Sequence, residues 1–303
     1  MDLITTPAFI FCLCTVVCIV LCHAIWRWRE NRNNERVTPG FKLLRGPGES
    51  LQRQIAAIDD KLFSWLLNIL GLPLIMLAST AGAYLLSGKT AFDGFVAILI
   101  QYVLPLVFIW TLYSTIHLLR LLSKRRNLYL GYFGERIVSE SLDSLRAKGA
   151  CVFHDVPVSA EQGRVNIDHV VICPAGVFAI ETKTRRKGPV REGRADGKII
   201  YDGAQLAYPW GEDTFGISRA ANNALWLEKT IAKTGIPNVP AHAILTFPGW
   251  RVELTDSAAN SAVRVLTPAQ IPLHLETLPP KLAANQIKQL AQHIETLCRD
   301  VEF

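Results

Sequence analysis

Long uncharged apolar stretches dominate the first 126 residues of the chain. Residues 8–26, 62–86 and about 95–119 each contain no Asp, Glu, Lys or Arg. At a rise of about 1.5 Å per residue, a helix of roughly 20 residues matches the hydrocarbon core of a bilayer. The pattern therefore predicts three transmembrane helices, rather than three buried helices of a soluble protein.

Basic residues lie asymmetrically around these stretches. The segment between the first and second stretch holds eight Lys or Arg, the next segment holds only Lys89, and Arg120, Lys124, Arg125 and Arg126 follow the third. No Lys or Arg precedes the first stretch, unlike in a cleaved signal peptide. By the positive-inside rule we expect a multi-pass protein of the inner (plasma) membrane. Its N-terminus lies outside and its C-terminal domain is cytoplasmic.

After Arg126 the periodicity becomes that of an α/β domain with a mixed sheet. Apolar residues recur at helical spacing over 131–148, and short β-rich runs follow. We divide the chain into a membrane region (1–126), a nuclease-like α/β domain (127–250) and a C-terminal β-α-α extension that packs on it (251–303). The predicted elements after the first helix are strands at 151–156, 165–172, 177–183 and 196–201, a helix at 217–233, strands at 243–247 and 263–266, and helices at 267–278 and 281–301.

The composition excludes several classes of protein. Half of the residues are apolar and 19% are charged, which excludes a disordered, collagen-like or disulfide-scaffold chain. Residues 1–126 hold 13 basic and 7 acidic residues, whereas residues 127–303 hold 19 of each. The net charge of +6 therefore belongs to the membrane region. Cys151, Cys173 and Cys298 show no metal-site spacing, which fits a reducing cytoplasm.

Four polar residues stand out against the apolar pattern of the α/β domain. Asp168 lies inside a predicted strand, Glu181 and Lys183 share one face at the end of the next strand, and Glu135 lies on the first helix. A tight turn at 173–176 makes the two strands neighbours. Carboxylate oxygens suit Mg²⁺ or Mn²⁺, which orients water and neutralises phosphate charge, and an ammonium stabilises the same charge. By itself, however, a Glu-x-Lys pair is also common on a solvated strand face.

Three segments strengthen the catalytic interpretation because of their order and spacing. They are Gly131-x-x-Gly-Glu135, Asn166-Ile-Asp-His169 and Gly176-Val-Phe-Ala-Ile-Glu-Thr-Lys183. Together they resemble the nuclease-related domain (NERD) family, a branch of the PD-(D/E)xK nuclease-like superfamily, over roughly residues 128–245. The resemblance implies a restriction-endonuclease-like core. It also implies metal ligands at Asp168, Glu181 and Glu135, and a catalytic lysine at Lys183.

A later motif departs from the family pattern. The segment Ser218–Leu227 resembles the family's later helix, which usually begins with Asn-Pro followed by a Gln. This chain has neither the Pro nor the Gln there, and Arg219 or Asn222 stands in that region. The departure leaves two alternatives open, an active enzyme and a catalytically degenerate domain.

A basic cluster directly follows the motif strand. Arg185, Arg186, Lys187 and Arg191, together with Arg219, are the residues we expect to contact phosphates of a nucleic acid. A solvated loop or contact with anionic lipid head groups are the alternatives. His169 points to the strand face opposite Asp168, and we interpret it as structural.

The sequence thus favours a membrane-anchored nuclease that uses Mg²⁺ or Mn²⁺ to hydrolyse phosphodiesters of DNA or RNA at the cytoplasmic face. Nucleic acid and the lipid bilayer are its expected partners, and homo-oligomer formation stays open. The main alternative is a degenerate nucleic-acid-binding or sensing module tethered to the membrane. A transport protein is disfavoured because no charged residue lies in the predicted spans.

Overall fold

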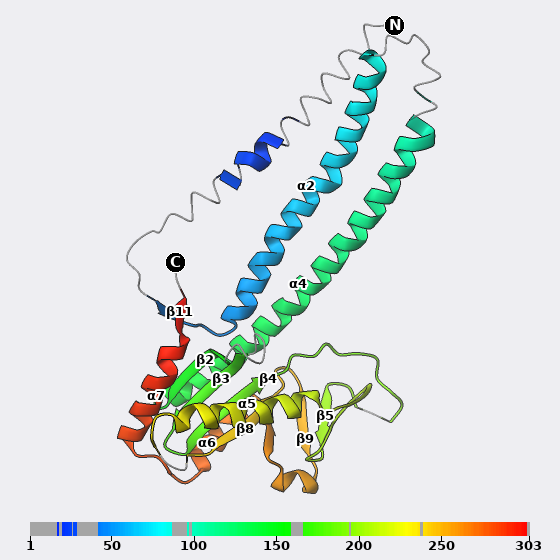
Figure 1. Ribbon diagram of the computed structural model, residues 1–303. Helices are drawn as coiled ribbons and strands as arrows, with labels where there is room; N and C mark the ends of the chain where they lie inside the picture. The colour runs from blue at the N-terminus through cyan, green and yellow to red at the C-terminus, as the bar shows by residue number, and fades with distance from the viewer. Residues whose placement is uncertain are drawn as a thin grey trace. The chain divides into compact units, whose positions relative to one another are not determined.

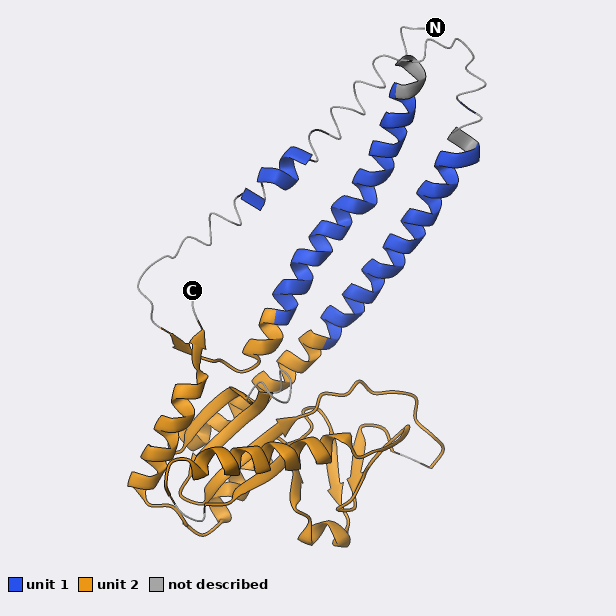
Figure 2. Cartoon of the chain, in the orientation of Figure 1, with its two compact units in different colours: residues 1–39, 54–127, 303 blue, residues 40–53, 128–302 orange. Residues whose placement is uncertain are grey.

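A computed structural model describes residues 17, 20–25, 27–28, 42–86, 96, 99–158, 166–193, 195–236 and 239–301. The chain forms two compact units, coloured separately in Figure 2. Unit 1 comprises residues 1–39, 54–127 and 303, and unit 2 comprises residues 40–53 and 128–302.

Unit 1 consists of helices in its described part. The helix α2 (Glu49–Leu86) contributes residues 54–86, and a π-helix (Leu99–Val103) leads into α4 (Leu104–Arg146), of which residues 104–127 belong here. The switch from π to α geometry falls beside Pro105. Proline has no N–H to donate to the preceding turn, so the regular ladder cannot run through this point.

The structure contains two helices that are long and apolar enough to cross a membrane, at Glu49–Gly82 and Gln101–Arg146. Only 17% and 11% of their most apolar windows are buried. They correspond to the second and third predicted spans. Most of the first predicted span lies outside the described residues, although residues 20–25 are helical. What the structure supports is therefore a helical N-terminal region with two apolar helices, and it does not clearly show three spans.

The central sheet of unit 2 has five strands in the order β10-β8-β4-β3-β2. Figure 1 labels four of these strands, β2, β3, β4 and β8. The antiparallel strands β2, β3 and β4 are joined to β8 and β10 by parallel pairing, so the sheet is mixed as predicted. The strands are β2 (Cys151–Pro157), β3 (Asn166–Cys173), β4 (Gly176–Thr182), β8 (Ala241–Thr246) and β10 (Val263–Leu266).

Helices cover both faces of this sheet. On one face α5 (Phe215–Ala232) and α7 (Ala284–Cys298) enclose a core that includes Val170, Ala179 and Leu245. On the other face α4 and α6 (Gln270–Thr277) enclose a second core that includes Val171 and Ile180. Alternate residues of one strand enter different cores because successive side chains of a strand point to opposite faces.

Two smaller sheets were not foreseen in full. In the sheet β7-β6-β5-β9, only the strand at 196–201 was predicted. In the other sheet, β1 (Leu43–Leu44) pairs with β11 (Arg299–Val301), although a helix was expected to continue to residue 301. These strands are two to four residues long and depend on distant partners, so they leave little local pattern. The other members are β5 (Lys198–Tyr201), β6 (Leu206–Tyr208), β7 (Gly211–Asp213) and β9 (Arg251–Leu254), with a 3₁₀ turn at Asp256–Asn260.

The two units meet at residues 127 and 128, one residue after the boundary expected at 126, but they share a helix. The helix α4 continues without a break from Leu104 to Arg146, so the last predicted span and the first helix of the α/β domain are one element. Residues 40–53, which the sequence analysis placed in the membrane region, belong to unit 2. They do so because long-range pairing, such as that between Leu43 and Val301, holds them there.

Candidate functional site

The candidate site lies where β3 and β4 run side by side. The register that pairs His169 with Ile180 brings Asp168 level with Glu181 on the next row. The Thr182 amide donates a 2.6 Å hydrogen bond to Asp168 Oδ2. A tight turn follows β3, and Gly176 adopts a φ of +141° in it. The predicted hairpin therefore brings these two carboxylates together.

Glu181 is buried and surrounded by positive and polar donors. Lys183 Nζ lies 2.6 Å from Glu181 Oε1, and Arg219 Nε forms an ion pair with the same oxygen at 2.8 Å, although without hydrogen-bond alignment. Asn223 Nδ2 donates to Glu181 Oε2 at 2.8 Å. Both carboxylate oxygens of Glu181 are thus engaged, by Lys183 just after β4 and by two side chains of α5.

Glu135 approaches from α4, and only 7% of its surface is exposed. Burial raises the pKa of Glu135 to about 10, with further contributions from the charges of Asp168, Asp155 and Glu181, while a backbone hydrogen bond from Gly48 opposes the rise. Burial, followed by the charge of Glu181, also raises the pKa of Asp168 well above its usual range. The site therefore gathers carboxyl groups that resist ionising together.

The donor set partly fits a divalent cation. Glu135 Oε2 is buried without a hydrogen-bond partner among the described residues, and carboxylate oxygens are the ligands that Mg²⁺ and Mn²⁺ prefer. Within the described ranges, no three His, Cys, Asp or Glu side chains converge closely enough to enclose a metal ion. This arrangement suits Mg²⁺, which is usually held by one or two carboxylates together with water and substrate phosphate. Glu135 and Asp168 offer the open oxygens, whereas those of Glu181 are engaged.

The glycines of the first motif allow close packing around Glu135. A Cβ on Gly134 would lie 2.1 Å from the Thr184 methyl group, and a Cβ on Gly131 would lie 3.2 Å from Leu51. Each glycine thus lets another segment touch α4 near the site. The two glycines of the Gly131-x-x-Gly-Glu135 motif are therefore required for close packing, in addition to any chemical role of Glu135.

The predicted basic cluster lies on the irregular segment after β4. Arg185, Arg186, Lys187 and Arg191 are exposed there. Arg185 pairs with Asp213 at 2.6 Å, and its carbonyl accepts a 3.2 Å hydrogen bond from the buried Trp250 indole. Arg219 differs from the others because it faces Glu181 from α5. The structure thus separates one arginine at the carboxylates from four exposed basic side chains on the segment that follows β4.

The histidine next to Asp168 lies on the other face, as its strand position predicts. His169 Nδ1 is 2.8 Å from His154 Nδ1 in a buried pair. Arg146 donates a hydrogen bond to His154 Nε2 at 2.9 Å, so the ring proton of neutral His154 is on Nδ1. His154 Nδ1 therefore donates the hydrogen bond to His169 Nδ1. Burial lowers the pKa of His154 to about 4 and that of His169 well below its usual value. The pair is neutral and lies outside the carboxylate group.

Sequence reasoning missed two residues near the site. Asn223, rather than the exposed Asn222, reaches Glu181, and helical spacing alone does not separate these neighbours. Asp155 was not singled out, although the register of β2 and β3 brings it level with Asp168. A polar residue inside an apolar strand was the available signal.

Comparison with known proteins agrees with the sequence resemblance. Residues 130–248 match the family model of the nuclease-related domain, which supports assigning this part of the chain to the NERD family. An uncharacterized protein of Bacillus anthracis is 44% identical over 54 residues, which is 18% of this chain. The chain thus spans about a quarter (26%) of the length of this curated relative.

A structural comparison finds SfsA of Pyrococcus furiosus, solved in complex with Ca²⁺. The match covers 45% of this chain and 54% of that chain at 17% sequence identity, with a TM-score of 0.23. So low a score carries no argument about fold or function. The nuclease-related match thus rests on sequence.

Proposed function

We propose that the protein is a membrane-anchored, metal-dependent nuclease that hydrolyses phosphodiesters of DNA or RNA. The nuclease-related match suggests a nuclease-like function that interacts with nucleic acid. The observation that carries the proposal further is the buried group of Glu135, Asp168 and Glu181 with Lys183 at the end of β4. Such a group is costly to bury unless its charges are paired or bind a cation.

Each residue has a distinct role in this proposal. Glu135 and Asp168 hold Mg²⁺ or Mn²⁺, and Glu181 completes the acidic group. A bound ion supplies charge neutralisation at the phosphate and orients an attacking water. The Lys183 ammonium, held beside Glu181 at 2.6 Å, donates to the phosphate oxygen on which negative charge grows. Arg186, Lys187 and Arg191 are exposed on the segment that follows β4, and in this proposal they contact flanking phosphates.

A cleavage assay on the full chain in detergent tests this proposal. DNA and RNA oligonucleotides, single- and double-stranded, are offered with Mg²⁺ or Mn²⁺. Asp168→Ala and Lys183→Ala are each expected to abolish cleavage. Lys198→Ala is the matched control, because Lys198 forms a comparable ion pair with Glu253 on the smaller sheet. Equal cleavage by wild type and the Asp168 variant, or none by wild type, contradicts the proposal.

A second function, a degenerate binding module, is favoured by one observation. The Arg219 guanidinium already faces Glu181, where a cation-dependent enzyme needs free carboxylate charge. In this case the full chain retains nucleic acid on a filter in a salt-sensitive manner but does not cut it. Arg219→Gln, which introduces a glutamine in the region where the family motif has one, distinguishes the two functions. Cleavage that appears only in this variant shows that Arg219 silences the site.

The proposed anchor is the helical N-terminal region. The helices α2 and α4 expose large apolar side chains, among them Leu70 and Phe108, each more than 60% exposed. Such surfaces suit a lipid environment. With basic residues placed as described, we assign the α/β domain to the cytoplasmic side of the plasma membrane.

A further inference from the structure

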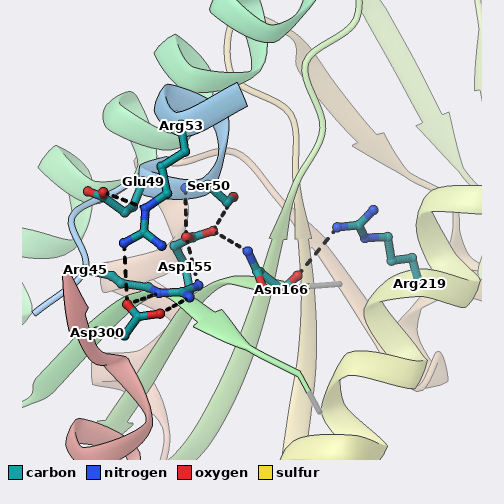
Figure 3. A network of polar contacts seen from close by, with 8 residues as sticks. All are labelled: Arg45, Glu49, Ser50, Arg53, Asp155, Asn166, Arg219 and Asp300. Carbon is teal, nitrogen blue, oxygen red and sulfur yellow. Dashed lines mark hydrogen bonds and ion pairs between the residues drawn. The ribbon is translucent and has the colours of Figure 1, made fainter. Parts of the chain in front are cut away.

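Asp155 is a buried carboxylate outside the group described above, and hydrogen bonds surround it (Figure 3). The Ser50 amide and hydroxyl donate to its two oxygens at 2.9 and 2.6 Å, Arg45 Nη1 donates at 3.2 Å, and Asn166 Nδ2 donates at 2.9 Å. Asp155 also has a φ of +49°, which non-glycine residues rarely adopt. Backbone strain of this kind persists only where the surroundings fix it.

Two hydrogen-bond partners of Asp155, Arg45 and Ser50, belong to residues 45–50. This segment precedes residues 130–248, which match the nuclease-related domain. Within this segment Gly48 has a φ of +71°, and a Cβ there would lie 2.6 Å from the Tyr132 ring. The Gly48 backbone also lies near enough to Glu135 to oppose the rise of its pKa. The segment that Asp155 holds therefore packs against α4 at Tyr132, within one helical turn of Glu135.

The third partner of Asp155, Asn166, connects it with the residues around Glu181. Asn166 donates to Asp155 through its side chain, and its carbonyl oxygen lies 3.5 Å from Arg219 Nη2. Arg219 in turn forms the 2.8 Å ion pair with Glu181. Asp155 also lies level with Asp168 on the neighbouring strand. Its hydrogen bonds therefore join the segment near Glu135 to the residues that contact Glu181.

We infer that residues 45–50 are a built-in part of the candidate active site and that Asp155 is the positioning residue that fastens them over Glu135. This inference rests on the proposed function, since it assigns a role in the same site. It means that the domain matched at residues 130–248 does not contain the whole site. We assign no ligand role to Asp155, because each of its two oxygens already accepts two hydrogen bonds.

Asp300 provides a matched control. Asp300 Oδ1 accepts a 2.7 Å hydrogen bond from Arg45, so Asp155 and Asp300 share this arginine. Asp300 also forms an ion pair with Arg53 at 3.6 Å, whereas Ser50 and Asn166 donate to Asp155. Asp155→Asn and Asp300→Asn both remove a negative charge from Arg45, but Asp300→Asn leaves the hydrogen bonds from Ser50 and Asn166 to Asp155 in place, so the segment stays fastened next to Gly48.

The first test measures how fast a water-soluble carbodiimide labels Glu135 in the full, detergent-solubilised chain, followed by peptide mass spectrometry. We expect slow labelling in wild type and Asp300→Asn, and labelling at least several-fold faster in Asp155→Asn. Ser50→Ala, which removes only the hydroxyl donor, is expected to raise the labelling rate of Glu135 by less. It replaces Asp155→Asn in the test if the Asp155 variant does not fold. Thermal unfolding of each variant separates local opening from global unfolding. Unchanged Glu135 labelling in folded Asp155→Asn and Ser50→Ala overturns the inference.

The second test is Mn²⁺ affinity by titration calorimetry of the same chains. Loss of a residue that orients metal ligands typically costs about 10–100-fold in affinity. We expect this loss in Asp155→Asn and not in Asp300→Asn. Faster labelling with unchanged Mn²⁺ affinity overturns the inference, because the segment is then held without serving the site. If wild type binds no Mn²⁺, the metal of the proposed function fails, and the labelling result alone decides the role of Asp155.

Discussion

The two units of the chain place polar and apolar side chains in opposite ways. In unit 1, Leu70, Phe108 and Ile109 are 62–68% exposed, whereas in unit 2 the carboxylates of Glu135, Asp168 and Glu181 are at most 8% exposed. Exposed apolar helices need an apolar surrounding, and buried carboxylates need donors or a cation. Under the proposed function, the surroundings supply what each unit needs: lipid for the first, and a cation with substrate for the second.

The largest expected difference concerns the loss of a leucine in each unit. Leu142→Ala removes a fully buried side chain of unit 2 and is expected to destabilise the chain by about 2–5 kcal/mol. Leu66→Ala, at a position of unit 1 that is 50% exposed, is expected to change stability by less than about 0.5 kcal/mol. Denaturant unfolding of the detergent-solubilised chain measures both. Equal losses would show that α2 is packed like a core helix.

A charge placed on each unit sharpens the contrast. Phe108→Arg in α4 is expected to oppose membrane insertion by roughly 2.5–3.5 kcal/mol and to shift protein out of the membrane fraction. Leu273→Arg on α6, at a position with a similar 65% exposure, is expected to leave the distribution unchanged. Carbonate extraction followed by immunoblotting measures the distribution. Identical behaviour of the two variants argues against a spanning α4.

The sequence predicted much of this contrast and missed part of the site. Uncharged runs indicated the apolar helices, and the two-residue period placed Glu181 and Lys183 on one strand face beside Asp168. Asn223 and Asp155 escaped because their roles depend on contacts across 42 residues to Glu181 and 105 residues to Ser50. Local periodicity has no information on such partners, and the same holds for the pairing of β1 with β11.

The pH dependence of stability tests the buried carboxyl group. With its pKa raised to about 10, folded Glu135 holds a proton that the unfolded chain releases above about pH 4.3, so stability falls as pH rises between these values. Glu135→Gln removes this loss. In chelator, the variant is expected to gain roughly 1–3 kcal/mol over wild type at about pH 9 and little at about pH 5.

The control for this experiment is Glu253→Gln, which changes an exposed glutamate of the smaller sheet. It is expected to follow wild type at every pH. Thermal unfolding across the pH series provides the measurement. A difference between Glu135→Gln and wild type that stays constant with pH would mean that Glu135 is ionised in the folded chain.

The smallest expected effect concerns the exposed basic cluster. Arg186→Gln and Lys187→Gln are each expected to weaken binding of any nucleic acid sequence and to reduce the salt slope of the affinity by about 1. Filter binding over a salt series measures this slope. Arg251→Gln and Arg264→Gln alter exposed arginines elsewhere in unit 2 and are expected to leave it unchanged. Equal effects of both pairs would show that only overall charge matters.

The central claim is that the buried carboxylates of unit 2 form a cation site. Titration calorimetry of the full chain with Mn²⁺, comparing wild type, Asp168→Asn and the control Glu253→Gln, tests it most directly. The account predicts one site in wild type and in the control, and none in Asp168→Asn. Equal binding by all three chains, or no binding by wild type, would contradict it.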